Sequence, residues 1–134
     1  MANSSIAHLY LEAMCGADGN YAAALFTVDG VLDDYRGGHR VGRDAIRQFI
    51  DARPPRTLEF LSDVIRIGPR LTVYTHMDYQ DGRSKTVRFI FTAQGDLIEH
   101  LCNSDIEFVP EDLRTRQAAS QHAPLASPPD TFPQ

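Results

Sequence analysis

The sequence predicts an α+β domain in which three helices come first and an antiparallel sheet follows. Apolar residues recur at helical spacing as far as Ile50, and Pro54-Pro55 then ends that pattern. The segments that follow are rich in Val, Ile, Thr, Phe and Tyr, and hairpin signals separate them. Helices grouped before strands are typical of the α+β class.

The first helix is predicted from an apolar stripe, and Gly16 is suited to end it. A second helix is expected from an Asp18 cap to about Val28, where Asp29-Gly30 turns the chain into a short strand over 31–35. Gly37-Gly38 breaks that strand. The stripes of the first and third helices consist of Ile6, Leu9, Tyr10, Ala13 and Met14, and of Ala45, Ile46, Phe49 and Ile50.

Four strands are expected over 57–67, 71–80, 84–94 and 97–108, and Asp81-Gly82 and Gly95-Asp96 join the last three. Composition changes after Pro110, where a short helix over 111–120 and then an extended or disordered end are expected. The predicted organisation is therefore one domain over 1–109 and a C-terminal tail over 110–134.

Composition limits the possible partners. The 134 residues are 43% hydrophobic, which suits one domain with a sizeable core. The net charge is −5, Lys85 is the only lysine and the arginines are scattered, so neither nucleic acid nor an anionic membrane is an expected partner. No Lys or Arg precedes Arg36 and no apolar run is long enough to span a bilayer, so we expect a cytoplasmic protein.

Two-residue hairpin turns predict which side chains share one face of the sheet. They set Val87 opposite His76 and Phe89 opposite Tyr74. The second hairpin extends the same rows to Ser104, Cys102 and His100. The other face would carry Val73, Ile90 and Leu101, and we expect a second copy of the chain to cover it, giving a homodimer through the sheet. The alternative cover is the C-terminal tail.

The stretch from Tyr10 to Phe49 carries a family resemblance. Its marks are Tyr10-Leu-Glu, Gly16-Ala-Asp18, Asp29-Gly30-Val-Leu-Asp33-Asp34-Tyr35 and Gly42-Arg-Asp-Ala-Ile46-Arg-Gln-Phe49. They resemble the opening of a nuclear-transport-factor-2-like domain of the SnoaL-like or ketosteroid-isomerase-like kind. The resemblance implies a cystatin-like cone, in which a strongly curved sheet wraps three helices around an apolar pocket. It also implies that many members carry an acid-base carboxylate in that pocket.

Tyr10 and Asp34 are the main candidate site residues. Aligned without gaps, the helix-one tyrosine and first-strand aspartate of ketosteroid isomerase fall on these two positions. The resemblance implies that the aspartate moves a proton beside a carbonyl and that the tyrosine hydroxyl hydrogen-bonds the developing enolate. Residue chemistry agrees, because an acid beneath an apolar helix loses water and becomes a stronger base.

One departure from the isomerase pattern affects the expected chemistry. The protonated aspartic acid that completes the isomerase oxyanion hole falls on Val87, which has no proton to donate. His76 and Ser104 flank Val87 in the predicted ladder and are alternative donors. We therefore predict Asp34, Tyr10, His76 and His100 as catalytic candidates. The predicted substrate-binding residues are Tyr74, Val87, Phe89, Cys102 and Ser104.

Simpler interpretations exist for each candidate. Asp34 can hydrogen-bond the Gly37-Gly38 turn, Tyr10 can be a core residue, and the histidines can be half-buried with a backbone partner. His76, Asp78 and His100 have the residue types of an iron site, but the predicted ladder separates the histidines by about 13 Å, so no metal is expected.

These observations favour cofactor-free proton transfer on a small apolar carbonyl compound, such as isomerisation, cyclisation or dehydration. The ligand is expected to be apolar or aromatic, and no cofactor is implied. The alternative is a non-catalytic ligand-binding or dimerisation module of the same fold.

Overall fold

A computed structural model describes residues 3–106 of the chain. The predicted tail over 110–134 and the end of the last predicted strand lie outside these residues. The helices are α1 (Asn3–Cys15), α2 (Gly19–Ala24) and α3 (Arg43–Asp51). The strands are β1 (Phe26–Asp34), β2 (Gly38–Val41), β3 (Arg56–Phe60), β4 (Ile65–Ile67), β5 (Arg70–Tyr79), β6 (Ser84–Gln94) and β7 (Leu97–Asp105).

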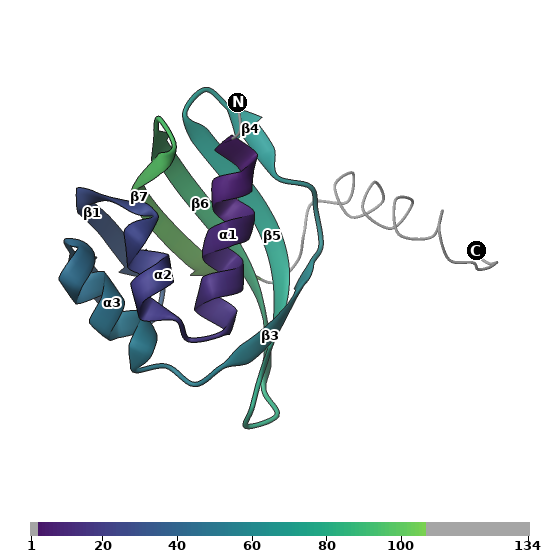
Figure 1. Cartoon of the computed structure of the whole chain (residues 1–134). Helices are drawn as coiled ribbons and strands as arrows, with labels where there is room; N and C mark the ends of the chain where they lie inside the picture. The colour runs from purple at the N-terminus through teal and green to yellow at the C-terminus, as the bar shows by residue number, and fades with distance from the viewer. Residues whose placement is uncertain (1–2, 107–134) are drawn as a thin grey trace.

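The seven strands form one curved, open, mixed sheet with the helices on one face (Figure 1). The strand order is β2-β1-β7-β6-β5-β3, and β4 pairs with β5 beside β3. The α+β class is confirmed. The pairing of β1 with β7 is parallel, which the predicted meander did not include. It brings the end of β1 beside β7, far away in the sequence.

The helical predictions hold for α1 and α3, and α2 is shorter than expected. Asp18 caps α2 as predicted, since its side chain accepts a hydrogen bond from the Tyr21 N–H at 3.1 Å. The helix ends at Ala24 because Phe26 already pairs with Ile98 in β7, and the Ile98 N–H donates to the Leu25 carbonyl at 2.8 Å. Pairing with a distant strand overrides the local helical pattern here.

Two further strand boundaries differ from the predictions. The chain turns after β1 and returns as β2, a short strand that the sequence pattern did not predict. Gly37 permits this turn, because its φ of +94° lies in the left-handed region. The predicted strand over 57–67 is divided into β3 and β4, which pair with different parts of β5.

The register of β5 against β6 differs from the predicted one by one residue. The turn is longer than two residues, since Asp78 pairs with Ser84. Val87 therefore lies opposite Thr75, and Phe89 lies opposite Val73. Because side chains alternate between the faces of a strand, a slip of one residue moves every side chain of one strand to the other face.

The register of β6 against β7 is also shifted, although its turn was predicted correctly. Gln94 pairs with Leu97, as a two-residue Gly95-Asp96 turn requires. A bulge then follows, because Thr92 pairs with His100 while Ala93 pairs with Ile98. Beyond the bulge, Phe89 lies opposite Asn103.

We call the helix-facing side of the sheet the inner face and the opposite side the outer face. The inner face and α1 share a buried apolar core. The Tyr10 ring packs edge-on against Phe26 and Phe91, with centroids 5.8 Å away in both cases. The buried inner-face residues of β5, β6 and β7 are Leu71, Val73, Thr75, Met77, Val87, Phe89, Phe91, Ile98, Leu101 and Asn103.

Candidate functional site

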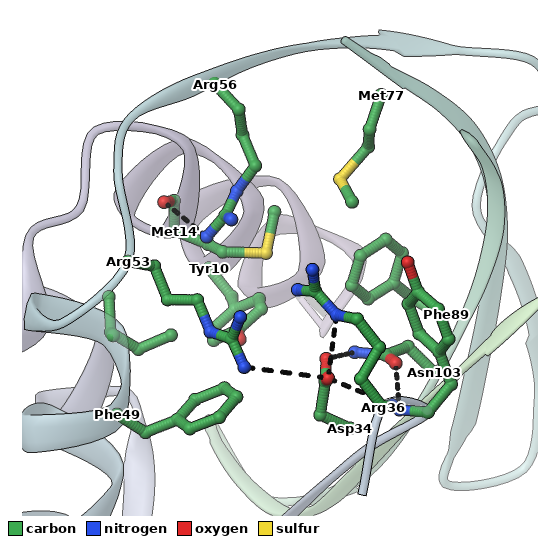
Figure 2. Close-up of a pocket in the computed structure, with 12 residues that line it drawn as sticks. Tyr10, Met14, Asp34, Arg36, Phe49, Arg53, Arg56, Met77, Phe89 and Asn103 are labelled. Atoms are coloured by element: carbon green, nitrogen blue, oxygen red, sulfur yellow. Dashed lines mark hydrogen bonds and ion pairs between the residues drawn. The ribbon is translucent and has the colours of Figure 1, made fainter. Parts of the chain in front are cut away.

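A small pocket lies on the inner face, where α1, the chain after α3 and the end of β1 meet (Figure 2). Both main candidates, Tyr10 and Asp34, line it. The space left among the side chains is about 10 Å³, which is room for about one water molecule. The lining residues are Tyr10, Met14, Asp34, Tyr35, Arg36, Phe49, Ile50, Arg53, Arg56, Met77, Phe89 and Asn103.

Asp34 ends β1 with its carboxylate turned into this pocket and 7% of its side chain exposed. Its Oδ2 accepts hydrogen bonds from the backbone N–H of Arg36 at 3.2 Å and from the Arg36 Nε at 3.4 Å. The Arg53 guanidinium lies 3.9 Å from the same oxygen. Asn103 donates from Nδ2 to Oδ1 at 3.1 Å. The carboxylate is thus held on both oxygens.

Asn103 is a site residue that the sequence analysis missed. Its amide oxygen accepts a hydrogen bond from the Tyr35 N–H at 2.9 Å, while its nitrogen donates to Asp34. The side chain therefore fixes both the carboxylate and the turn that follows it. The bulge in β7 places Asn103 on the inner face, and the sequence carried no separate signal for that bulge.

Tyr10 reaches the pocket from α1 and is 1% exposed. Burial raises the pKa of its hydroxyl well above the ordinary value, and the charge of Arg56 opposes that shift. Tyr10 therefore remains a neutral hydrogen-bond donor at the edge of the small pocket.

Three arginines line the same pocket, and the sequence analysis missed all three. Arg36 and Arg53 contact Asp34, and Arg53 also lies over the Phe49 ring at 4.2 Å. Burial and the like charge of Arg36 lower the pKa of Arg53. Arg56 is 8% exposed, and its only hydrogen bond within the described residues is a long one of 3.4 Å to the Met14 carbonyl.

Known structures resemble this chain, although no family model and no curated protein matches it. A protein of known crystal structure from Sphaerobacter thermophilus is 30% identical, with a TM-score of 0.68 over 77% of this chain and 94% of that one. A cystatin-fold protein from Novosphingobium aromaticivorans is 21% identical, with a TM-score of 0.66 over 78% and 98%. A putative ketosteroid isomerase from Kribbella flavida is 16% identical, with a TM-score of 0.68 over 81% and 80%.

Further matching structures are described as NTF2-like proteins of unknown function. The chain therefore has the fold of the nuclear-transport-factor-2-like (NTF2-like) proteins. The likeness shows the fold and does not specify the chemistry.

The NTF2-like fold separates the remaining predicted site residues. Phe89 lines the pocket, and Val87 is buried on the inner face without reaching it. The prediction that the other five share this face is wrong, because both hairpin registers are shifted by one residue. The residues on the outer face are Tyr74, His76, His100, Cys102 and Ser104.

The outer-face histidines have acidic partners of their own. His76 Nε2 lies 3.3 Å from Asp78, and His100 Nε2 lies 2.9 Å from Asp33. Asp33 also contacts the Nδ1 of His39. Among residues 3–106 no group of three or more His, Cys, Asp or Glu side chains is placed to hold a metal ion. Across the same range no helix is long and apolar enough to cross a membrane.

Proposed function

We propose that this NTF2-like domain binds a small carbonyl compound and moves a proton on it without a cofactor, with Asp34 as the base and Tyr10 as the hydrogen-bond donor. One observation carries the proposal: a nearly buried carboxylate from β1 and a buried tyrosine from α1 line the same pocket. Such a pair has the groups that enolisation needs, a proton acceptor and a donor for the carbonyl oxygen.

The proposed step uses these two groups in concert. An Asp34 oxygen takes a proton from the carbon beside the carbonyl, and the C–H electron pair moves to form the enolate. Tyr10 donates its hydrogen bond to the oxygen on which negative charge develops. Its raised pKa keeps it protonated in neutral solution. Asp34 then returns the proton to the same or another carbon, which completes an exchange or an isomerisation.

A substrate needs more room than the structure leaves, and the side chain of Arg36 can supply it. Arg36 lies over Asp34 in Figure 2, with 32% of its side chain exposed. Because it reaches solvent, rotating it outward opens the pocket without disturbing the core. Asn103 and the Arg36 backbone N–H continue to hold the carboxylate when this side chain moves.

The second candidate function is a binding module of the same fold that performs no chemistry. The observation that favours it is the small pocket, whose carboxylate already has several cationic and amide partners. The two candidates differ in whether the removal of Asp34 abolishes a reaction or only changes binding.

Deuterium exchange beside a carbonyl tests this difference. We would follow a panel of small ketones and keto acids by proton NMR in deuterium oxide, with the wild type, Asp34→Asn, Tyr10→Phe and the matched control Asp33→Asn. Loss of the base is expected to slow exchange by about 10²–10⁴-fold. Asp33→Asn should keep the wild-type rate because Asp33 lies on the other face. Equal rates for Asp34→Asn and Asp33→Asn, or no exchange above buffer for any compound, would favour the binding module.

A further inference from the structure

The pocket contains more positive charge than its carboxylate balances. Its charged lining residues are three arginines and one aspartate, in a chain whose net charge is −5. Arg36 and Arg53 make ion pairs with Asp34, whereas Arg56 makes none within the described residues. This concentration of guanidinium groups is therefore a local feature of the pocket, opposite in sign to the whole chain.

Arg56 is the least satisfied of the three. It begins β3 and is more than nine-tenths buried, and its Nε has no hydrogen-bond partner in the described part of the chain. One terminal nitrogen donates to the Met14 carbonyl at 3.4 Å, and the guanidinium lies 6.0 Å from the centre of the Tyr79 ring. Figure 2 shows this side chain entering the pocket with no link to Asp34. A buried cation with so few partners is costly unless an anion joins it.

Arg53 is the natural second donor for such an anion. Within residues 3–106 its only ion pair is the 3.9 Å contact with Asp34, which is longer than a charge-assisted hydrogen bond. Its guanidinium lies over the Phe49 ring at 4.2 Å, and this contact positions it at the pocket. Moving it toward an incoming anion leaves Asp34 bound to Asn103 and to the Arg36 backbone.

We propose that the pocket binds a ligand that carries a carboxylate, with Arg56 and Arg53 as the residues that bind that group. This inference rests on the proposed function, since it names the substrate class at the same site: a small keto acid instead of an uncharged apolar ketone. Guanidinium groups match carboxylates geometrically through paired N–H donors. The ligand carboxylate competes with Asp34 for Arg53.

Two probes that differ in charge test the inference. Levulinate and its methyl ester have the same ketone, and only the acid carries a carboxylate. We would titrate each into the protein and follow the arginine Nε–Hε signals by NMR. Levulinate is expected to bind at least about tenfold more tightly than the ester and to shift the signals of Arg53 and Arg56. Arg53→Gln should weaken levulinate binding by about tenfold, and Arg47→Gln should not, because Arg47 pairs with Asp44 and Asp51 on the surface of α3.

Several outcomes would overturn the inference. These are equal affinities for the acid and the ester, no binding of levulinate at millimolar concentration, or equal losses in Arg53→Gln and Arg47→Gln. Arg56→Gln is a further variant. If it does not fold, the arginine Nε–Hε signals of the wild type and of Arg53→Gln test the inference. Levulinate binding without deuterium exchange would sink only the proposed catalysis. Equal exchange of acid and ester would sink only the carboxylate preference.

Discussion

Asp33 and Asp34 are neighbours in the sequence but lie on opposite faces of the sheet. Asp34 faces the helices, with 7% of its side chain exposed, and two arginines and an asparagine surround it. Asp33 faces outward, with 40% of its side chain exposed, between His39 and His100. Because side chains alternate along a single strand, the same residue type has two different environments here.

The charged residues on the two faces also differ in how much they can contribute to stability. Hydrogen bonds from His39 and then His100 lower the pKa of Asp33. Stability from this shift is present above the ordinary pKa of 3.8 and is lost as the pH falls through the lower folded value. Because Asp33 is well exposed, solvent and salt screen that contribution. The inner face is screened less, so its contacts should dominate stability.

Substitutions at two adjacent residues of β6 should differ most in their cost to stability. Phe89 is fully buried on the inner face, and Ile90 is half-buried on the outer face. Phe89→Ala should lower the free energy of unfolding by about 3–5 kcal/mol through lost burial and a cavity. Ile90→Ala should cost only about 1 kcal/mol. Urea unfolding followed by circular dichroism measures both, and similar losses would contradict the observed register.

Ile90→Ala also tests the predicted homodimer through the sheet. If a second copy covers the outer face, the cost of Ile90→Ala depends on protein concentration, because dissociation then precedes unfolding. Sedimentation equilibrium of the wild type and Ile90→Ala provides the independent measurement. A monomer at all concentrations would exclude the predicted dimer.

A smaller effect is expected from the two aspartates themselves. Asp34→Ala removes the acceptor for Asn103 and for two arginines, and it should cost about 1.5–3 kcal/mol. Asp33→Ala should cost less than about 1 kcal/mol because its partners are exposed. Thermal unfolding at neutral pH compares the variants. A greater loss for Asp33→Ala would reverse the assignment of the two faces.

The smallest effect concerns alkaline pH. Burial raises the pKa of Tyr10 above 10.0 in the folded state, so the unfolded chain releases this proton first. Stability from this residue is therefore present below pH 10 and falls as the pH rises above it, by about 1.4 kcal/mol per pH unit. Tyr10→Phe should lose less stability than the wild type between about pH 10 and pH 11.

Tyr35 provides the matched comparison for that experiment. The pKa of Tyr35 is also raised, by burial and by its 3.4 Å contact with the Tyr79 hydroxyl, although it is only partly buried. Tyr35→Phe should therefore change the loss of unfolding free energy above about pH 10 less than Tyr10→Phe does. The measurement is the free energy of unfolding as a function of pH above about pH 10. If Tyr10→Phe and the wild type lose the same amount over this range, Tyr10 ionises in the folded protein.

Local sequence patterns predicted α1, α3, the start of α2 and the fold class, and the family resemblance marked the two main candidates. The apolar stripes predicted α1 and α3, Asp18 predicted the cap of α2, and the resemblance marked Tyr10 and Asp34. These features depend on local spacing, which short stretches of sequence contain. The Gly95-Asp96 turn is local in the same way and was also predicted.

Which side chains meet at the pocket depends on contacts between distant parts of the chain. The longer turn before Ser84 and the bulge in β7 moved five predicted residues to the outer face and brought in Asn103. Side chains alternate between the two faces along a strand, so one extra residue moves every side chain beyond it to the opposite face. The arginines were missed for a related reason, because Arg36 follows β1 whereas Arg53 and Arg56 lie between α3 and the start of β3, and only the folded chain brings these segments together.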